Sequence, residues 1–522
     1  MSKWRKKALS TPMMLALAAS MVLGGCSSNG GNNGAGEPSA SPGDSSSAAP
    51  EQTAASDLKP YTIKWYLPNG VFPDAEAVEA EMNKITQAKI NATLDIQWVD
   101  WGNYDQKMKT VLASGEKVDL MFTSNWTNDY ISNVNKGAYL DITDLLQEHG
   151  QNILKQVPAN AWDAAKIDGK LYAIINTQVL ARQPGMIINK TYLDKYGYKA
   201  EDFAKLEDLT PFLEKVAASE PDKYAFRVKG NDDQMTFIGT ALGLEYFSDT
   251  NPGVLRTNDD STTIVNMYET EEFKGFLKLM HEWYQKGIIR KDASTLTDTT
   301  ADENAGKYIS RTGVMNPDNP AVQAGAFGSG KAENVQLVPF GPPYMSTGSI
   351  IATMTAIPRT SEDPARAMML YDLMYSDSEL YNLMNYGIEG KHYTKVAGED
   401  DLIQLTANSG YQVNSGWEFG NLFNAYRTDA TQPKWIPVGP DMNNNAVTSK
   451  ILGFSFDPSS VKSELAQTAS VISEFKAGLI TGSLDPETTL PKLNDKLKKA
   501  GLDKLLAEMQ KQIDEWKAAN GK

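Results

Sequence analysis

Residues 61–67 read Tyr-Thr-Ile-Lys-Trp-Tyr-Leu and begin the pattern that decides the fold. Apolar side chains at every second position, from Ile63 to Leu67, predict a strand. Four further segments follow in the order helix, strand, helix, strand. They cover residues 74–85, 93–99, 104–114 and 119–123. This alternation predicts an open, mostly parallel α/β sheet.

The length and composition of the chain limit what it can be. About 460 residues follow Leu58, which is too many for one core and predicts two or three. The 65 acidic and 50 basic residues give a net charge of −15. A surface this acidic argues against nucleic-acid partners and anionic membranes. One cysteine and three scattered histidines offer no transition-metal cluster, so we expect neither a metal nor a cofactor.

The first 58 residues predict export and tethering. Basic residues precede an apolar stretch over 13–23, which is too short to span a bilayer. The run Leu23-Gly24-Gly25-Cys26 resembles a bacterial lipobox. This resemblance implies a signal peptide over 1–25 and a lipid, such as palmitate, on Cys26. Residues 26–58 are rich in Ser, Gly, Asn and Ala and predict a disordered tether. The alternative is a secreted protein whose Cys26 stays unmodified in the leader.

Five later stretches carry a resemblance to a known family. They are residues 105–120, 169–174, 189–197, 385–393 and 500–512. Together with the lipobox, and in this order, they resemble extracellular solute-binding proteins of ABC importers, in the family of maltose-type and oligosaccharide binders. The last two stretches look like a subgroup of large lipoproteins from Gram-positive bacteria.

The resemblance implies an α/β fold of two lobes, the periplasmic-binding-protein-like fold, with hinge strands and a cleft between the lobes. The crossings between lobes are expected near residues 187–191, near 344–349 and after Tyr393. Lobe 1 would then comprise residues 59–188 plus about 346–400, and lobe 2 residues 189–345 plus about 401–522. Closure of such lobes around a ligand is a known switching mode.

The strand order also predicts where a ligand binds. In open α/β sheets, ligands bind beyond the carboxyl ends of the strands. Loops at these positions, and later loops, contain aromatic rings for the apolar faces of sugars and polar groups for their hydroxyls. The predicted ligand-binding residues are Asn69, Trp101, Asn125, Trp126, Gln178, Arg182, Tyr344, Trp417 and Asn421. The alternatives are a core position for each tryptophan, turn or cap roles for the amides, and a surface ion pair for Arg182.

These features predict a lipid-anchored protein on the extracellular face of the membrane. We expect a monomer that binds a small polar solute, with an oligosaccharide favoured, and delivers it to the transmembrane subunits of an ABC permease. No catalytic residues are predicted. Two alternatives remain, a co-receptor for a sensor kinase and an anchored glycoside hydrolase with an undetected carboxylate pair. Residues 258–262 could bind calcium, although a simple turn is the other interpretation.

Overall fold

The structure is a computed structural model that describes residues 57–232, 234–248, 250–328 and 330–521. The predicted signal peptide, Cys26 and nearly all of the predicted tether lie outside these residues. Within the described ranges, no helix combines the length and the apolar character needed to cross a membrane.

The first lobe is built on a five-stranded sheet in the order β2-β1-β3-β14-β6. Its strands are β1 (Tyr61–Pro68), β2 (Ala92–Val99), β3 (Leu120–Thr123), β6 (Ala173–Ile175) and β14 (Met354–Ala356). β1 pairs in parallel with both β2 and β3, whereas β14 is antiparallel to β3 and to β6. The carboxyl ends of β1, β2, β3 and β6 therefore meet at one edge, as predicted.

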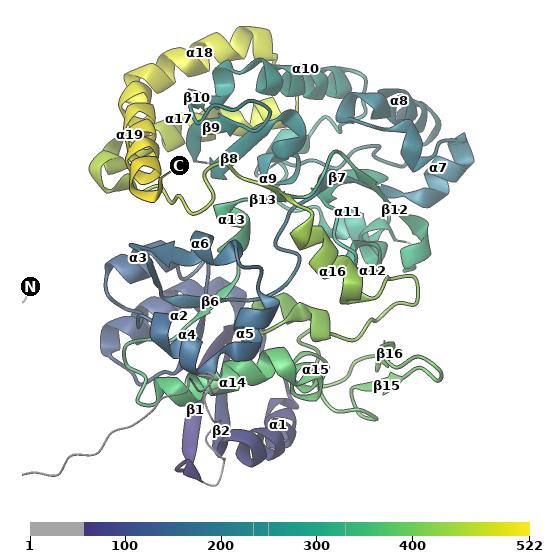
Figure 1. Cartoon of the computed structure of the whole chain (residues 1–522). Coiled ribbons are helices and arrows are strands. Elements are labelled where there is room, and N and C mark those ends of the chain that lie inside the picture. Colours follow the sequence, from purple (N-terminus) through teal and green to yellow (C-terminus); the bar gives the residue numbers. More distant parts are fainter. Residues whose placement is uncertain (1–56, 233, 249, 329, 522) are drawn as a thin grey trace, which may run out of the picture. The chain divides into compact units, whose positions relative to one another are not determined.

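The first lobe also contains helices and short hairpins (Figure 1). The helices are α1 (Ala75–Ile90), α2 (Trp101–Ser114), α3 (Tyr130–Asn135), α4 (Thr143–His149), α5 (Gln151–Gln156), α6 (Ala161–Ala165), α13 (Thr347–Ile350), α14 (Pro364–Ser376), α15 (Ser378–Tyr386) and α16 (Trp435–Asn444). The hairpins pair β4 (Lys166–Ile167) with β5 (Lys170–Leu171), and β15 (Tyr393–Lys395) with β16 (Ile403–Leu405). Asp363 and Asp377 cap α14 and α15 with carboxylates that accept hydrogen bonds from backbone N–H groups.

One local prediction is wrong. The apolar residues over 349–357 predict a single strand, but α13 occupies the beginning of this stretch and β14 only its end. The cause is a reciprocal cap in which the Ser346 side chain accepts from the Ser349 N–H, and the Ser349 side chain accepts from the Ser346 N–H. These bonds start a helix where hydropathy alone indicated a strand.

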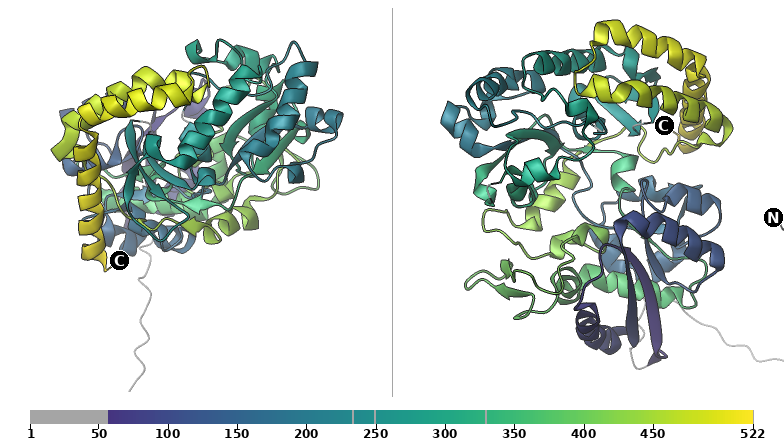
Figure 2. Two further views of the ribbon diagram at one scale, coloured as in Figure 1. Left: turned by 90° about the horizontal axis from the view of Figure 1, so that it is seen from above. Right: turned by 180° about the vertical axis from the view of Figure 1, so that it is seen from behind.

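The second lobe holds two small sheets and the longest helices. One sheet has the order β11-β7-β12 and the other the order β10-β9-β8. The strands are β7 (Pro184–Asn189), β8 (Leu244–Ser248), β9 (Asn251–Arg256), β10 (Ile264–Asn266), β11 (Ser310–Val314) and β12 (Val335–Pro339). The helices are α7 (Lys190–Tyr196), α8 (Thr210–Ser219), α9 (Gln234–Ile238), α10 (Glu271–Gln285), α11 (Thr300–Asn304), α12 (Asn319–Ala324), α17 (Lys462–Ile480), α18 (Pro486–Lys499) and α19 (Leu502–Asn520). Figures 1 and 2 show α18 packed alongside α10.

The two main hydrophobic cores divide the chain differently from the sequence prediction. The first core contains residues from 63 to 181 and from 345 to 452, and the second core runs from 186 to 340 and from 472 to 502. The first crossing therefore lies at about 182–185, a few residues before the predicted place. Residues 401–452 were predicted in lobe 2, but they pack with the first core. Tyr411 and Phe419 are buried there, each with its ring against aromatic neighbours of the first lobe.

Tyr344 is the residue on which the three crossing segments converge. Its backbone exchanges two hydrogen bonds with Arg182, at 2.8 and 3.0 Å. In β13 (Tyr344–Met345) it also pairs in parallel with β17 (Val447–Thr448). Its hydroxyl donates to Glu245 Oε2 at 2.7 Å, and Ser449 Oγ donates to the same oxygen at 2.6 Å. Tyr344 thus fixes the connection to a buried carboxyl group of β8, whose pKa burial raises.

We expect Tyr344→Phe to lower the free energy of unfolding by about 1–2 kcal/mol, because Glu245 loses one of its two side-chain donors in a buried setting. Chemical denaturation measures the change. Tyr172→Phe is the control, since the Tyr172 hydroxyl has no hydrogen-bond partner among the described residues, and it should change stability by less than about 0.5 kcal/mol. Equal changes in the free energy of unfolding of the two variants would contradict a stabilising role for the hydrogen bond from Tyr344 to Glu245.

Candidate functional site

Three of the predicted tryptophans form one aromatic cluster. The ring centroids of Trp101 and Trp126 are 5.5 Å apart, and those of Trp101 and Trp417 are 5.7 Å apart, both in stacked geometry. Trp126 and Trp417 complete a triangle at 6.3 Å. The buried ring of Phe122 lies 6.0–6.1 Å from all three. We call Trp101, Trp126 and Trp417 the tryptophan patch.

The sheet edge positions two members of the patch. Trp101 is the first residue of α2, directly after β2, and the Asp100 carboxylate caps that helix by accepting from the Gly102 N–H at 2.9 Å. Trp126 lies in the loop after β3. The Ser124 hydroxyl accepts from the backbone N–H of Trp126, and the Trp126 indole donates to the Ala352 carbonyl at 2.8 Å. These bonds fix the ring in place without burying it.

Trp417 comes from far along the chain, in the 3-10 turn Gly416–Glu418. The Tyr381 hydroxyl donates to the Gly416 carbonyl at 2.7 Å, and Asn385 Oδ1 accepts from the Ser415 N–H at 3.2 Å. Both anchors lie on α15. The turn is therefore held against the first lobe, which places Trp417 on Trp101.

The patch remains available to a ligand. Trp126 is 54% exposed, and Trp101 and Trp417 are partly buried. The indole N–H groups of Trp101 and Trp417 have no hydrogen-bond partner among the described residues. By contrast, Trp65 and Trp283 are fully buried. An exposed aromatic surface with free donors suits a ligand that has both apolar faces and hydroxyl groups.

The predicted amides Asn69, Asn125 and Gln178 lie at the same sheet edge. Asn69 Nδ2 contacts Glu418 Oε1 at 3.5 Å, directly after Trp417. Asn125 is exposed and donates to the Gly348 carbonyl at 3.1 Å. Gln178 donates to the Thr353 hydroxyl at 2.6 Å, next to the carbonyl that holds Trp126. The structure brings these three amides together with the patch.

The other three predicted residues have partners within the protein. Arg182 and Tyr344 pair through their backbones at the hinge, and Tyr344 is only 7% exposed. Asn421 is buried, donates to Gln156 Oε1 and accepts from the Phe423 N–H at 3.0 Å. These contacts place Tyr344 and Asn421 beneath the surface rather than on it.

The sequence analysis did not identify Glu418, which lies beside the patch. Its side chain is fully buried, and Oε2 has no hydrogen-bond partner among the described residues. Burial raises the pKa of Glu418 to about 9, so the carboxyl group is protonated at neutral pH. The only sequence signal was a charged residue between two aromatic neighbours, Trp417 and Phe419.

A pocket of about 150 Å³ also adjoins the patch. One wall comes from Asp318 and α12, and the other from residues between 385 and 435, including Trp417. The sequence analysis identified only Trp417 among its lining residues. A larger cavity of about 740 Å³ lies on the second lobe. Tyr344 is the only predicted ligand-binding residue in its lining, so we place the candidate site at the patch and the smaller pocket.

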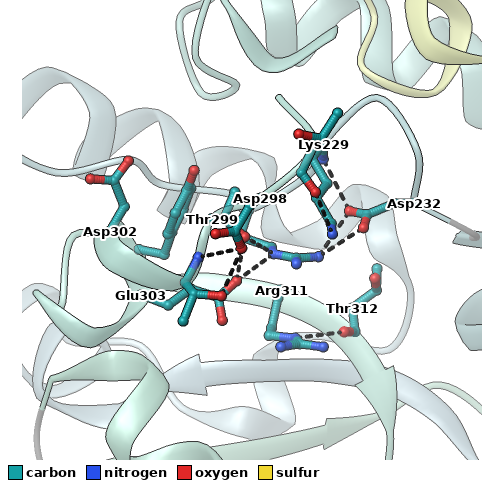
Figure 3. A network of polar contacts seen from close by, with 12 residues as sticks. Lys229, Asp232, Asp298, Thr299, Asp302, Glu303, Arg311 and Thr312 are labelled. Carbon is teal, nitrogen blue, oxygen red and sulfur yellow. Dashed lines mark hydrogen bonds and ion pairs between the residues drawn. The ribbon is translucent and has the colours of Figure 1, made fainter. Parts of the chain in front are cut away.

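A cluster of charged side chains on the second lobe forms a network of ion pairs that holds the fold together (Figure 3). Arg227 donates to both oxygens of Asp232 at 2.9–3.0 Å and to Glu303 at 2.8 Å. These carboxylates satisfy the Arg227 guanidinium and tie its loop to α11. Arg311 lies beside this cluster and donates weakly to the Thr312 carbonyl at 3.4 Å.

Residues 258–262, which the sequence analysis considered for calcium, form a turn. Asp259 Oδ1 accepts from the Ser261 N–H at 2.7 Å and contacts the Lys450 ammonium at 3.3 Å. The lysine places a positive charge where a cation would need to bind.

Comparisons with known proteins agree with this architecture. A family model described as bacterial extracellular solute-binding protein matches residues 69–379, and a domain of unknown function (DUF3502) matches residues 450–518. A carbohydrate ABC transporter substrate-binding protein of Streptococcus pneumoniae serotype 4 is 30% identical over 524 residues, 99% of each chain.

Solved structures show the same fold. The N-glycan transport solute-binding protein NgtS of Streptococcus pneumoniae is 28% identical, with a TM-score of 0.78 over 88% of this chain and 99% of NgtS. NgtS in complex with Man5GlcNAc gives 30% identity and a TM-score of 0.66, over 88% of this chain and 98% of that one. The predicted two-lobe α/β fold with hinge strands and an interlobe cleft is confirmed.

We expect Glu418→Gln to make folding less dependent on pH. Between its ordinary pKa of 4.5 and about 9, the unfolded wild type releases the Glu418 proton while the folded protein keeps it. Wild-type stability should therefore fall as the pH rises, by roughly 3 kcal/mol at pH 7. Glu418→Gln cannot ionise, so its stability should not fall in this way. The free energy of unfolding of the variant, relative to that of the wild type, should increase from about pH 5 to about pH 8 in denaturant titrations. Parallel curves for the two proteins would show that Glu418 ionises normally.

Proposed function

The chain belongs to the bacterial extracellular solute-binding proteins, and on that basis we propose that it captures an oligosaccharide for an ABC importer. The tryptophan patch is the observation that supports this most directly. Three adjacent indole rings offer more aromatic surface than a single small solute covers. A chain of sugar rings uses such a surface well, because each ring has an apolar face.

The groups around the patch support the same ligand class. Free indole N–H groups on Trp101 and Trp417 can donate to sugar hydroxyls, and Asn69, Asn125 and Gln178 supply amides at the rim. We propose these six residues, counting Trp126, as the ligand-binding set. Arg182, Tyr344 and Asn421 are assigned to the hinge and the supporting loops. We propose that capture involves no covalent chemistry, in keeping with a family described as solute-binding proteins.

Transport requires that the permease distinguish the loaded receptor from the empty one. We propose that the lobes close on the bound oligosaccharide, with the segments that meet at Tyr344 as the hinge. The ligand then shifts the population toward the closed form by the difference in its affinity for the two forms. The permease recognises that form and receives the sugar.

The family and the lipobox-like run that ends at Cys26 support a location at the outer face of the cell. Members of this family are extracellular, and we propose that a lipid on Cys26 holds this one, as a monomer, at the outer face of the cell membrane. A diacylglycerol anchor supplies the two chains that stable attachment needs. The net charge of −15 keeps the folded part away from the anionic bilayer surface.

A thermal-shift screen tests the ligand class. A bound oligosaccharide should raise the melting temperature, because it stabilises the folded protein by about 2.7 kcal/mol at a hundredfold excess over the dissociation constant. Peptides and amino acids should not. The bound sugar should be recovered intact by mass spectrometry. Recovery of cleaved sugar would instead establish the hydrolase alternative. Binding without loss of sugar uptake on deletion of the protein would favour the sensor co-receptor.

We expect Trp126→Ala to weaken oligosaccharide binding by about 10- to 100-fold, because a stacked, central aromatic contact is lost. The melting temperature of the empty protein should change little, because the Trp126 side chain is more than half exposed. Calorimetric titration and thermal melts measure the two effects. Trp516→Ala, on α19 of the second lobe, is the matched control and should leave affinity unchanged. If Trp126→Ala lowers the melting temperature of the empty protein as well as the affinity, Trp126 has a structural role instead.

A further inference from the structure

The pocket beside Trp417 contains a carboxylate that the protein itself does not use. Asp318 lies in the turn before α12 and lines the pocket from the side of the second lobe. Within the described residues, no side-chain donor and no cation contacts it, and it accepts only from its own backbone N–H. Burial raises the pKa of Asp318 to about 6, so the group is mostly ionised at neutral pH. A partly buried anion without donors is costly unless a ligand supplies them.

Two amides add to the free hydrogen-bonding capacity of the pocket. Gln432 is only 6% exposed, yet its side-chain amide makes no hydrogen bond to the described residues. The amide of Asn414, at the rim, is likewise without a partner in the described part of the chain. None of the residues that line the pocket is Lys, Arg or His. The pocket therefore presents acceptors and amides, but no cation.

The size of the pocket and its aromatic walls define what fits. A cavity of about 150 Å³ holds a single six-membered ring. Trp417 and Trp435 contribute aromatic surface to it. Trp417 also stacks on Trp101, so the pocket is continuous with the tryptophan patch. One ring in the pocket would thus continue into further rings that lie over the patch.

We propose that this pocket receives one neutral, terminal sugar ring of the captured oligosaccharide, and that the two oxygens of Asp318 accept hydrogen bonds from a pair of adjacent hydroxyl groups on it. The inference rests on the proposed function and specifies its ligand. Adjacent hydroxyls match the two acceptor oxygens of a carboxylate, and bonds to a charged acceptor are the stronger kind. A terminal uronate would bring a second negative charge into a pocket without a cation, where like charges repel at low dielectric constant. The receptor therefore selects neutral chain ends over acidic ones.

Calorimetric titration with two matched probes tests this selection. The probes are Man5GlcNAc and the same oligosaccharide with its terminal mannose residues oxidised at C6 to uronates. The wild type should bind the neutral probe at least tenfold more tightly. Asp318→Asn should weaken binding of the neutral probe about tenfold and bring the two affinities within about threefold of each other. Asp441→Asn is the matched control, since Asp441 is exposed on α16 and does not line the pocket.

The outcomes separate the inference from the function on which it rests. Failure of the wild type to bind either probe would overturn the inference, and a thermal-shift screen in which no oligosaccharide binds would overturn the proposed function as well. Binding of both probes with equal affinity, or a preference for the uronate, would overturn the inference and leave oligosaccharide capture standing. Wild-type affinities alone decide this, so the test survives if Asp318→Asn does not fold. An Asp318→Asn variant that folds and keeps both the affinity and the tenfold ratio would also overturn it.

Discussion

The parallel pairing of β1 with β2 and β3 is the constraint on which the binding surface depends. In a parallel arrangement the strands end at the same edge, so the loops that follow them become neighbours although they are distant in sequence. Trp101 follows β2 and Trp126 follows β3, and the register of β1 with both strands sets their separation. Phe122, within β3 itself, then lies beneath both rings. A one-residue slip of β3 would turn Phe122 to the opposite face and remove the floor of the patch.

The hinge adds a second level of organisation. Three segments distant in sequence meet at Tyr344, and each contributes only a few residues, so they connect two cores without merging them. Two small β-bridges are soft compared with the five-stranded sheet, which concentrates any motion at this point. The bonds from Tyr344 and Ser449 to Glu245 keep the connecting segments attached to the second lobe. This combination suits the proposed closure, because the patch lies wholly within the first lobe.

Local patterns predicted the sheet edge because they reflect backbone geometry. Alternation in β1, the caps of α14 and α15, and the loops with Trp101 and Trp126 all have signals within a few residues. The position of residues 401–452 has no such signal, because it depends on Tyr411 and Phe419 finding aromatic partners hundreds of residues earlier. Asp318 and Glu418 were missed for the same reason. A single acidic residue looks like a surface group until its distant neighbours are known, whereas tryptophans in polar loops are unusual enough to stand out.

The two acidic residues beside the patch show how the site departs from what stability alone would favour. A buried carboxyl group at position 418 and a carboxylate without donors at position 318 each destabilise the empty protein. Glu418 and Asp318 differ in how the free-energy cost of burying the carboxyl group is reduced. Glu418 takes up a proton and becomes neutral, which removes its charge from the underside of the patch. Asp318 keeps its charge for most of the time at neutral pH, and its relief must come from outside the chain. A ligand hydroxyl pair provides that relief only when the ring occupies the pocket, so binding energy is gained where a neutral chain end fits.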